Sequence, residues 1–214
     1  MNLIDRVLYV YYTNYIVSEW VVIIGIRSES KKITRELLLE KTALLLNNQG
    51  FLNVSSKDIS RECNLSQGTL FLHFKTKENL LSTILNTNLD SLDKELNSRC
   101  KSSDLPDTFL RNYIDVIIEH ESFLSRAYKD LPYFPESLKR NFANLETTIK
   151  NLFFENLKSN LTKKISIVDS FISIDAFISQ IYKNLVEKET YSEHNSIIRQ
   201  KRGKITKLYK TLFL

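Results

Sequence analysis

The sequence predicts an all-α protein, with a helix-turn-helix domain near the N-terminus followed by a larger helical domain. Glycine and proline number only 4 and 3 among 214 residues. Because these residues punctuate helices, their scarcity favours long helices over many short strands. Apolar residues make up 43% of the chain and recur at helical spacing over long stretches, as expected for amphipathic helices packed around a core.

Net charge and cysteine content narrow the class of protein only a little. The formal charge of +5 and the sequence pI near 9.0 suit a polyanionic partner. Cys63 and Cys100 show neither metal-ligand spacing nor a disulfide framework. We therefore expect two reduced thiols in a cytoplasmic protein.

The first part of the chain is apolar and aromatic from Val7 to Ile26. A membrane span needs about 20 apolar residues, but Glu19 lies near the centre and would cost about 2.5–3.5 kcal/mol to insert. A secretory signal fits poorly, since no basic cluster precedes the apolar run. We interpret residues 1–30 as an accessory helix or a mis-started segment. A membrane anchor remains the disfavoured alternative.

Three capped helices follow one another between residues 55 and 97. Ser55 or Ser56 can cap a two-turn helix, and Asp58 follows three residues after Ser55, where a carboxylate favours a helix N-terminus. Asn64 tolerates a left-handed turn. Ser66 can cap a second helix over 67–74, and Thr76 a longer one over 77–97. Two short helices joined by a short turn define a helix-turn-helix.

Inward positions agree with this motif. Ile59 and Cys63 would point inward from the first short helix, and Leu70 and Phe74 from the second. An earlier helix, expected over 33–47, would end at Gly50. We expect a helix-turn-helix domain over 31–85 and a second helical domain over 86–214.

The segment from Lys32 to Leu85 resembles the N-terminal domain of the tetracycline-repressor (TetR) family. The resemblance lies in Gly50-Phe51, in Ser55-x-x-Asp58-Ile59-Ser60 and in the run from Asn64 to Leu80. It implies a transcriptional regulator that binds double-stranded DNA. Asn64 replaces the usual turn glycine, and Ser60 replaces a small apolar residue.

The resemblance also implies the residues that contact DNA. Phe71 replaces a tyrosine that usually touches a phosphate, so only packing is left there. His73 and Lys77 would contact the backbone, the latter from a helix N-terminus. Leu72 could meet a thymine methyl. The predicted DNA-contacting residues are Ser55, Ser66, Gln67, Gly68, Thr69, Phe71, Leu72, His73 and Lys77. Each could instead be an ordinary surface residue.

In the second half of the chain, the spacing of apolar residues predicts four helices, over about 108–129, 136–160, 166–189 and 193–212, with a break at 130–135. Its aromatic residues could line a pocket for a flat, hydrophobic effector, although most must be plain core. The predicted pocket residues are Phe109, Tyr113, Phe123, Tyr128, Phe142 and Phe153. His120, between two carboxylates, could bind a cation, but a solvated helix face is the simpler interpretation.

The helix over 167–186 has little polar face and must be buried on several sides. The resemblance implies that the last two helices form a two-fold dimer interface; an intramolecular core is the alternative. The predicted interface residues are Phe171, Phe177, Ile178, Ile181, Tyr182, Ile198, Ile205 and Leu208. The basic tail from Arg199 to Lys210 is a solvated rim or a second polyanion contact.

The sequence shows no phosphate-binding glycine loop, metal cluster or nucleophile elbow, so we expect neither an enzyme nor a cofactor. Our hypothesis is a cytoplasmic homodimeric repressor that binds a palindromic operator and is released by a small effector. The alternatives are a ligand-independent DNA-binding protein of the same fold and a membrane-tethered regulator.

Overall fold

The computed structural model describes residues 28–160, 166–188 and 195–214, and its regular structure there is entirely helical. The first described helix covers residues 28–49. The interpretation of residues 1–30 therefore falls almost wholly outside the described residues. Among the described helices, none is both long and apolar enough to cross a membrane. The later helices are α2 (Ser56–Glu62), α3 (Gln67–Phe74), α4 (Lys77–Arg99), α5 (Pro106–Glu119), α6 (Glu121–Asp130), η1 (Leu131–Tyr133), α7 (Glu136–Asn160), α8 (Ile167–Val186) and α10 (Ile197–Phe213).

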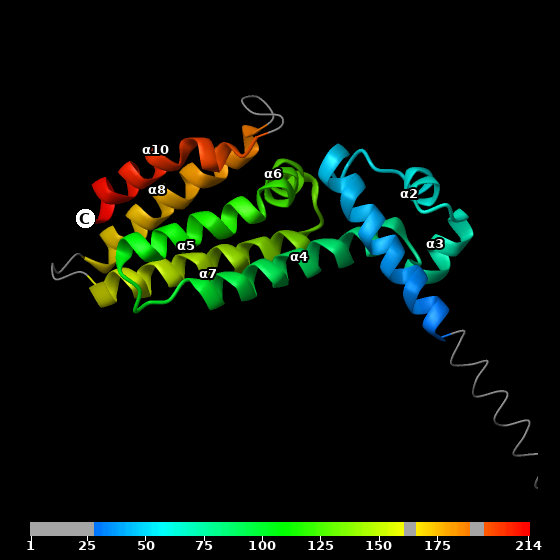
Figure 1. Cartoon of the computed structure of the whole chain (residues 1–214), viewed down its shortest axis with the longest axis horizontal. Coiled ribbons are helices and arrows are strands. Elements are labelled where there is room, and N and C mark those ends of the chain that lie inside the picture. Colours follow the sequence, from blue (N-terminus) through cyan, green and yellow to red (C-terminus); the bar gives the residue numbers. More distant parts are fainter. Residues whose placement is uncertain (1–27, 161–165, 189–194) are drawn as a thin grey trace, which may run out of the picture.

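The helices form a head and a body (Figure 1). The head contains the helix over 28–49, α2, α3 and the start of α4. The body is a bundle in which α4, α5, α7, α8 and α10 run along the long axis of the molecule. With 23 residues, α4 is about 35 Å long and belongs to both parts. The expected boundary at residue 85 lies within this helix, so that division of the chain stays a prediction.

The predicted break at 130–135 is occupied by η1, and α7 has the bounds that the sequence predicts. The single helix predicted over 108–129 is wrong, because the chain bends at His120 (φ −97°, ψ 6°) between α5 and α6. Two side chains hold this bend. The His120 Nε2 lies 2.8 Å from Glu95 Oε2 on α4, so a half-buried contact stands where a solvated face was predicted.

Glu121 holds the other side of the bend. Its buried carboxylate accepts hydrogen bonds from the backbone N–H groups of Ile197 (2.9 Å) and Ile198 (3.3 Å) and from the Ser196 hydroxyl. Lys188 Nζ lies 3.5 Å away. A carboxylate at a helix N-terminus is favoured by the helix dipole, so Glu121 fixes the start of α10 to the start of α6.

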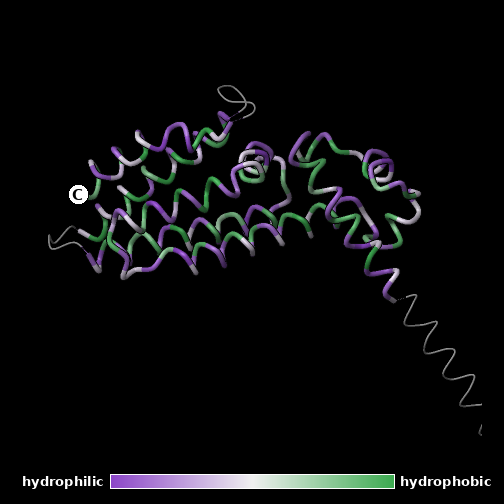
Figure 2. Tube along the Cα trace, in the orientation of Figure 1, coloured by the Kyte–Doolittle hydropathy of each residue, from purple (hydrophilic) through white to green (hydrophobic). Residues whose placement is uncertain are grey.

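Hydrophobic and hydrophilic residues alternate along the trace of the helices (Figure 2), and the buried apolar side chains form a core that extends through head and body. Phe51 connects the two parts. Its ring, which follows the first described helix, makes edge contacts with Phe123 (6.4 Å) and Phe134 (5.5 Å) of the body. The head is thus packed onto the body through an aromatic contact.

Polar contacts from α6 lock the same junction. Arg126 donates from Nε to the Asn47 carbonyl and from Nη2 to the Asn48 carbonyl, each at 3.1 Å. Asp130 Oδ2 accepts the Phe51 N–H at 2.7 Å. These bonds satisfy backbone groups at the end of the first described helix, which has no further turn to satisfy them.

Candidate DNA-binding interface

A reciprocal cap fixes the start of α2. The Asp58 N–H donates to Ser55 Oγ at 3.2 Å, while the Ser55 N–H donates to Asp58 Oδ2 at 3.1 Å. The Ser55 hydroxyl also donates to Asp58 Oδ2, and this bond, followed by the one from the Ser55 N–H, lowers the pKa of the Asp58 carboxyl. The predicted capping pair is confirmed and sets where the first helix of the motif begins.

The turn between α2 and α3 also forms as the residues predict. Asn64 has φ 53°, in the left-handed region that asparagine tolerates. Ser66 then caps α3 by accepting the Thr69 N–H at 3.0 Å. Leu70 and Phe74, one turn apart, are buried and anchor α3 to the head core. The opposite face of α3 is left to solvent.

That outward face of α3 consists of Gln67, Gly68, Phe71 and Leu72. Leu72 is 77% exposed and Phe71 39%. Gly68 has no crowding inside the protein, since an added Cβ would meet only Ser66 Oγ at 3.6 Å. Because glycine in a helix costs up to about 1 kcal/mol relative to alanine, its presence favours close approach of another molecule. The outward face suits a helix that enters a groove.

Three predicted contact residues already use their side-chain oxygens. Ser55 and Ser66 serve as helix caps, and the Thr69 hydroxyl lies 2.9 Å from Ser66 Oγ. Thr69 is also half-buried. These side chains therefore position the outward face of α3, and their own contact with DNA stays a prediction.

Two predicted phosphate contacts lie at the edge of this face. His73 is half-buried, and burial, followed by the charges of Lys31 and Arg35, lowers the pKa of its imidazole. Both effects favour the neutral form of the ring. Lys77, at the first position of α4, donates from Nζ to the Val54 carbonyl at 3.2 Å.

Exposed cations flank the motif at positions that sequence reasoning did not select. Lys57 lies in the first turn of α2, and Lys75 ends α3 with φ 60°; both are exposed. Their charge was visible in the sequence, but their exposure beside the outward face required the fold. Positive side chains at such positions can contact phosphates without reading bases.

The predicted pocket residues pack mainly on one another or on neighbouring aromatic rings. Phe153 makes edge contacts with Phe109 (4.9 Å) and Tyr113 (4.8 Å), and Tyr128 makes one with Phe142 (5.4 Å). Phe123 contacts Phe51 at the junction with the head. All except the half-buried Tyr128 are buried. Contact with an effector stays a prediction for each of them.

Five of the predicted interface residues lie in the protein's own core, as the intramolecular alternative anticipated. These are Phe177, Ile178, Ile181, Ile198 and Ile205. Phe171, Tyr182 and Leu208 are half-buried. Other side chains of α8 that the prediction left out face outward and are apolar, namely Ile167, Val168, Ile172 and Val186. An interface on the face of α8 remains a prediction, with these residues as its apolar part.

The chain thus carries a capped helix-turn-helix on a helical body, and known proteins resemble it in both sequence and fold. Residues 38–84 match the family described as bacterial regulatory proteins, tetR family. An uncharacterized HTH-type transcriptional regulator of Bacillus subtilis (strain 168), YuxN, is 33% identical over 112 residues. That match covers 49% of this chain but only 38% of the length of YuxN.

Solved structures share the fold over both parts of the chain. A TetR transcription regulator from Haloarcula marismortui ATCC 43049 superposes with a TM-score of 0.68 at 13% identity, covering 86% of this chain and 100% of its own. A TetR transcriptional regulator from Legionella pneumophila gives 0.64 at 19% identity, covering 80% and 95%. Residues 38–84 thus match the tetR family model, and the chain as a whole has the fold of these solved TetR regulators.

Proposed function

We propose that the chain is a transcriptional regulator that binds double-stranded DNA through α3. The observation that carries this proposal is the outward face of α3, where Gly68 gives close access and Leu72 is free to meet a base edge. The buried residues Leu70 and Phe74 hold the helix so that this face stays fixed. Rigid presentation of a recognition helix is what entry into a major groove requires.

The regulator is proposed to act as a homodimer on a palindromic operator. The apolar residues Val168, Ile172 and Val186 recur along the outward face of α8, and a second copy would remove them from water. On α10, a Cβ at Gly203 would meet nothing within 4 Å, so a partner helix could approach closely. A two-fold dimer would set two recognition helices about 34–36 Å apart, in successive major grooves.

A small hydrophobic effector is proposed to release the dimer from DNA. The body core contains a polar atom that suits such a ligand: the Tyr113 hydroxyl is buried and has no hydrogen-bond partner among the described residues. Buried polar atoms are normally paired. A ligand that entered beside Tyr113 and accepted a hydrogen bond from its hydroxyl would make a bond that the free protein lacks. The ligand-independent alternative predicts instead that no small molecule shifts the melting temperature.

DNA binding is tested by selecting bound fragments from a genomic library with the purified full chain. We expect enrichment of a palindromic site with half-sites one DNA turn apart. Leu72→Ala should weaken binding to that site by about tenfold, or about 1.4 kcal/mol. Leu105→Ala, which also shortens an exposed leucine but lies at the start of α5, should leave it unchanged. Absence of any preferred site would overturn the proposal.

Fractionation of the cells that produce the full chain distinguishes the cytoplasmic regulator from the membrane-tethered alternative. A regulator that works in the cytoplasm should be recovered without detergent, whereas a membrane-tethered one should stay in the membrane pellet at high salt. The proposal assigns no catalytic activity to the chain.

A further inference from the structure

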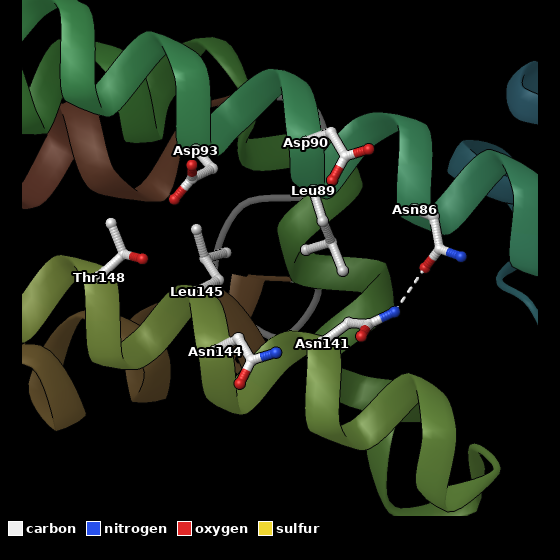
Figure 3. A pocket seen from close by; sticks show the side chains of 8 residues that line it. All are labelled: Asn86, Leu89, Asp90, Asp93, Asn141, Asn144, Leu145 and Thr148. Carbon is white, nitrogen blue, oxygen red and sulfur yellow. Dashed lines mark hydrogen bonds between the residues drawn. The ribbon is translucent and has the colours of Figure 1, made fainter.

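A hollow of about 430 Å³ lies between α4 and α7 on the body. Figure 3 shows side chains from both helices directed into the same gap. This volume is within the range of about 300–1,000 Å³ that is typical of small-molecule sites. None of the aromatic residues predicted to bind an effector lines it, so it is separate from that predicted pocket.

The α4 wall supplies acceptors. Asp90 and Asp93 lie one turn apart on α4, with Asn86 one turn before Asp90 and Leu89 at the base of the gap (Figure 3). Asp93 accepts a hydrogen bond from Asn97 Nδ2 at 3.3 Å. Two carboxylates on one helix face would by themselves indicate only a solvated surface. Here they border a hollow that is partly open to solvent and has α7 as its other wall, so a bound molecule could contact both helices.

The α7 wall is uncharged. Asn141, Asn144 and Thr148 face the carboxylates across the gap, and Leu145 lies between them (Figure 3). Asn141 Nδ2 donates to Asn86 Oδ1 at 2.8 Å, which ties the two walls together at one end. The hollow therefore has polar walls and a base of two leucines.

No positive side chain lines the hollow, although the chain carries a net charge of +5. Elsewhere on the body, three aspartates are paired with cations: Asp115 with Arg202 at 2.8 Å, Asp107 with Lys210 at 3.1 Å and Asp175 with Lys150 at 2.8 Å. Among the described residues, Asp90 and Asp93 have no such ion pair. The missing positive charge can be supplied from outside the protein.

We propose that this hollow binds a small aliphatic diamine. Its two ammonium groups would lie against Asp90 and Asp93 and the neighbouring amide oxygens, and its methylene groups would contact Leu89 and Leu145. A metal ion fits less well, because the volume is far larger than one ion. In addition, no cluster of three or more His, Cys, Asp or Glu side chains that could hold a metal occurs among the described residues.

A diamine held between the two walls would favour the observed position of α4 on α7. Because α4 begins in the head beside α3, occupancy would change how the head is held, a consequence that rests on the proposed function. A ligand shifts the equilibrium between two positions of α4 only by the difference in its affinity for them. Diamine binding itself requires no DNA, so failure of operator binding would leave the site untouched.

The test is calorimetric titration of the full chain with 1,4-diaminobutane at constant ionic strength. We expect saturable binding of one molecule per chain. The uncharged analogue 1,4-butanediol should not bind, and magnesium chloride at equal ionic strength should not compete. Binding of the diol with equal affinity, full competition by magnesium or absence of saturable diamine binding would each overturn the proposal.

Matched variants locate the site. Asp90→Asn combined with Asp93→Asn should weaken diamine binding at least tenfold. Glu136→Gln combined with Glu155→Gln removes the same charge from exposed positions of α7 outside the hollow and should preserve binding. Asn144→Lys, which places an ammonium group in the gap without removing an acid, should also abolish it. If both double variants lost the same diamine affinity, net charge alone would explain the binding, and the proposed site would be refuted.

Discussion

A substitution at Gly68 should lower the affinity of the head for DNA without lowering its stability. In the protein alone its added Cβ would make only an ordinary contact, 3.6 Å from Ser66 Oγ. Gly68→Ala should therefore leave the free energy of unfolding unchanged or raise it by up to about 1 kcal/mol. In a groove the extra methyl group would meet DNA, so we expect operator affinity to fall by about tenfold. Urea denaturation and fluorescence anisotropy measure the two effects, and unchanged affinity would contradict a close approach at this glycine.

Glu95 should make the body sensitive to acid. Its hydrogen bond with His120, followed by that with Arg99, lowers the pKa of the Glu95 carboxyl from 4.5 to about 2. The unfolded chain therefore binds a proton at higher pH than the folded chain does. Stability supplied by this group is present above about pH 4.5 and is lost as the pH falls toward 2.

Urea denaturation between pH 6 and 2.5 checks this effect against Glu95→Gln. The variant should be less stable than the wild type at pH 6, and its stability should fall less steeply with acid. Glu155→Gln removes an exposed carboxylate 3.8 Å from Lys158 and should keep the slope of the wild type. A Glu95→Gln slope equal to that of the wild type would assign the acid sensitivity to other groups.

At the scale of whole elements, the junction between head and body depends on a left-handed glycine. Gly50 has φ 83°, and a Cβ there would lie 3.1 Å from Asp130 Oδ2, the atom that accepts the Phe51 N–H. Gly50→Ala combines backbone strain with crowding of this bond. We expect it to cost about 1–3 kcal/mol of folding free energy. Amide hydrogen exchange should also show faster exchange at Phe51.

The variant Gly68→Ala is the matched control, since it adds the same methyl group at an uncrowded glycine. If both variants unfolded at the same urea concentration, the junction would tolerate a side chain and the geometric argument would fail.

The elements that sequence predicted well are those whose signals are local. Ser66 and Thr76 cap the helices that follow them, and Asn64 takes the turn conformation that its short polar side chain permits. The bend at His120 has no such signal, because neither glycine nor proline stands there. It depends on Glu95 and on the start of α10, which lie far away in the sequence, so only the fold reveals it.

Side-chain roles at the interface were predictable to a similar extent. Periodicity placed Gln67 and Leu72 on the outward face of α3. It could not show that the oxygens of Ser66 and Thr69 are bound to each other or that burial lowers the pKa of His73. On α8, periodicity shows that a residue is buried but not by which partner, which is why Phe177 lies in the core of one chain.

At the scale of the whole molecule, the outward face of α8 is apolar and remains exposed to solvent in a single chain. Ile172 is 61% exposed and Val168 65%, whereas Ile174 and Ile178 on the other side of the helix are buried. Apolar surface on both sides of one helix is expected where it packs on its own chain and on another. We therefore expect the wild type to elute as a dimer, with a mass of twice 25.0 kDa.

Ile172→Asp should dissociate this dimer, because each copy would bury an unpaired carboxylate at the interface. Two copies lose contacts at once, so a cost of about 2 kcal/mol per copy would weaken dimerisation by roughly a thousandfold. Light scattering after size exclusion measures the mass over a concentration series. Leu105→Asp introduces the same charge at an exposed leucine of the body and should remain dimeric. One recognition helix reads only a half-site, so the Ile172→Asp monomer should also lose its preference for a palindrome over a single half-site. If the variant stayed dimeric, the interface would lie elsewhere on the body.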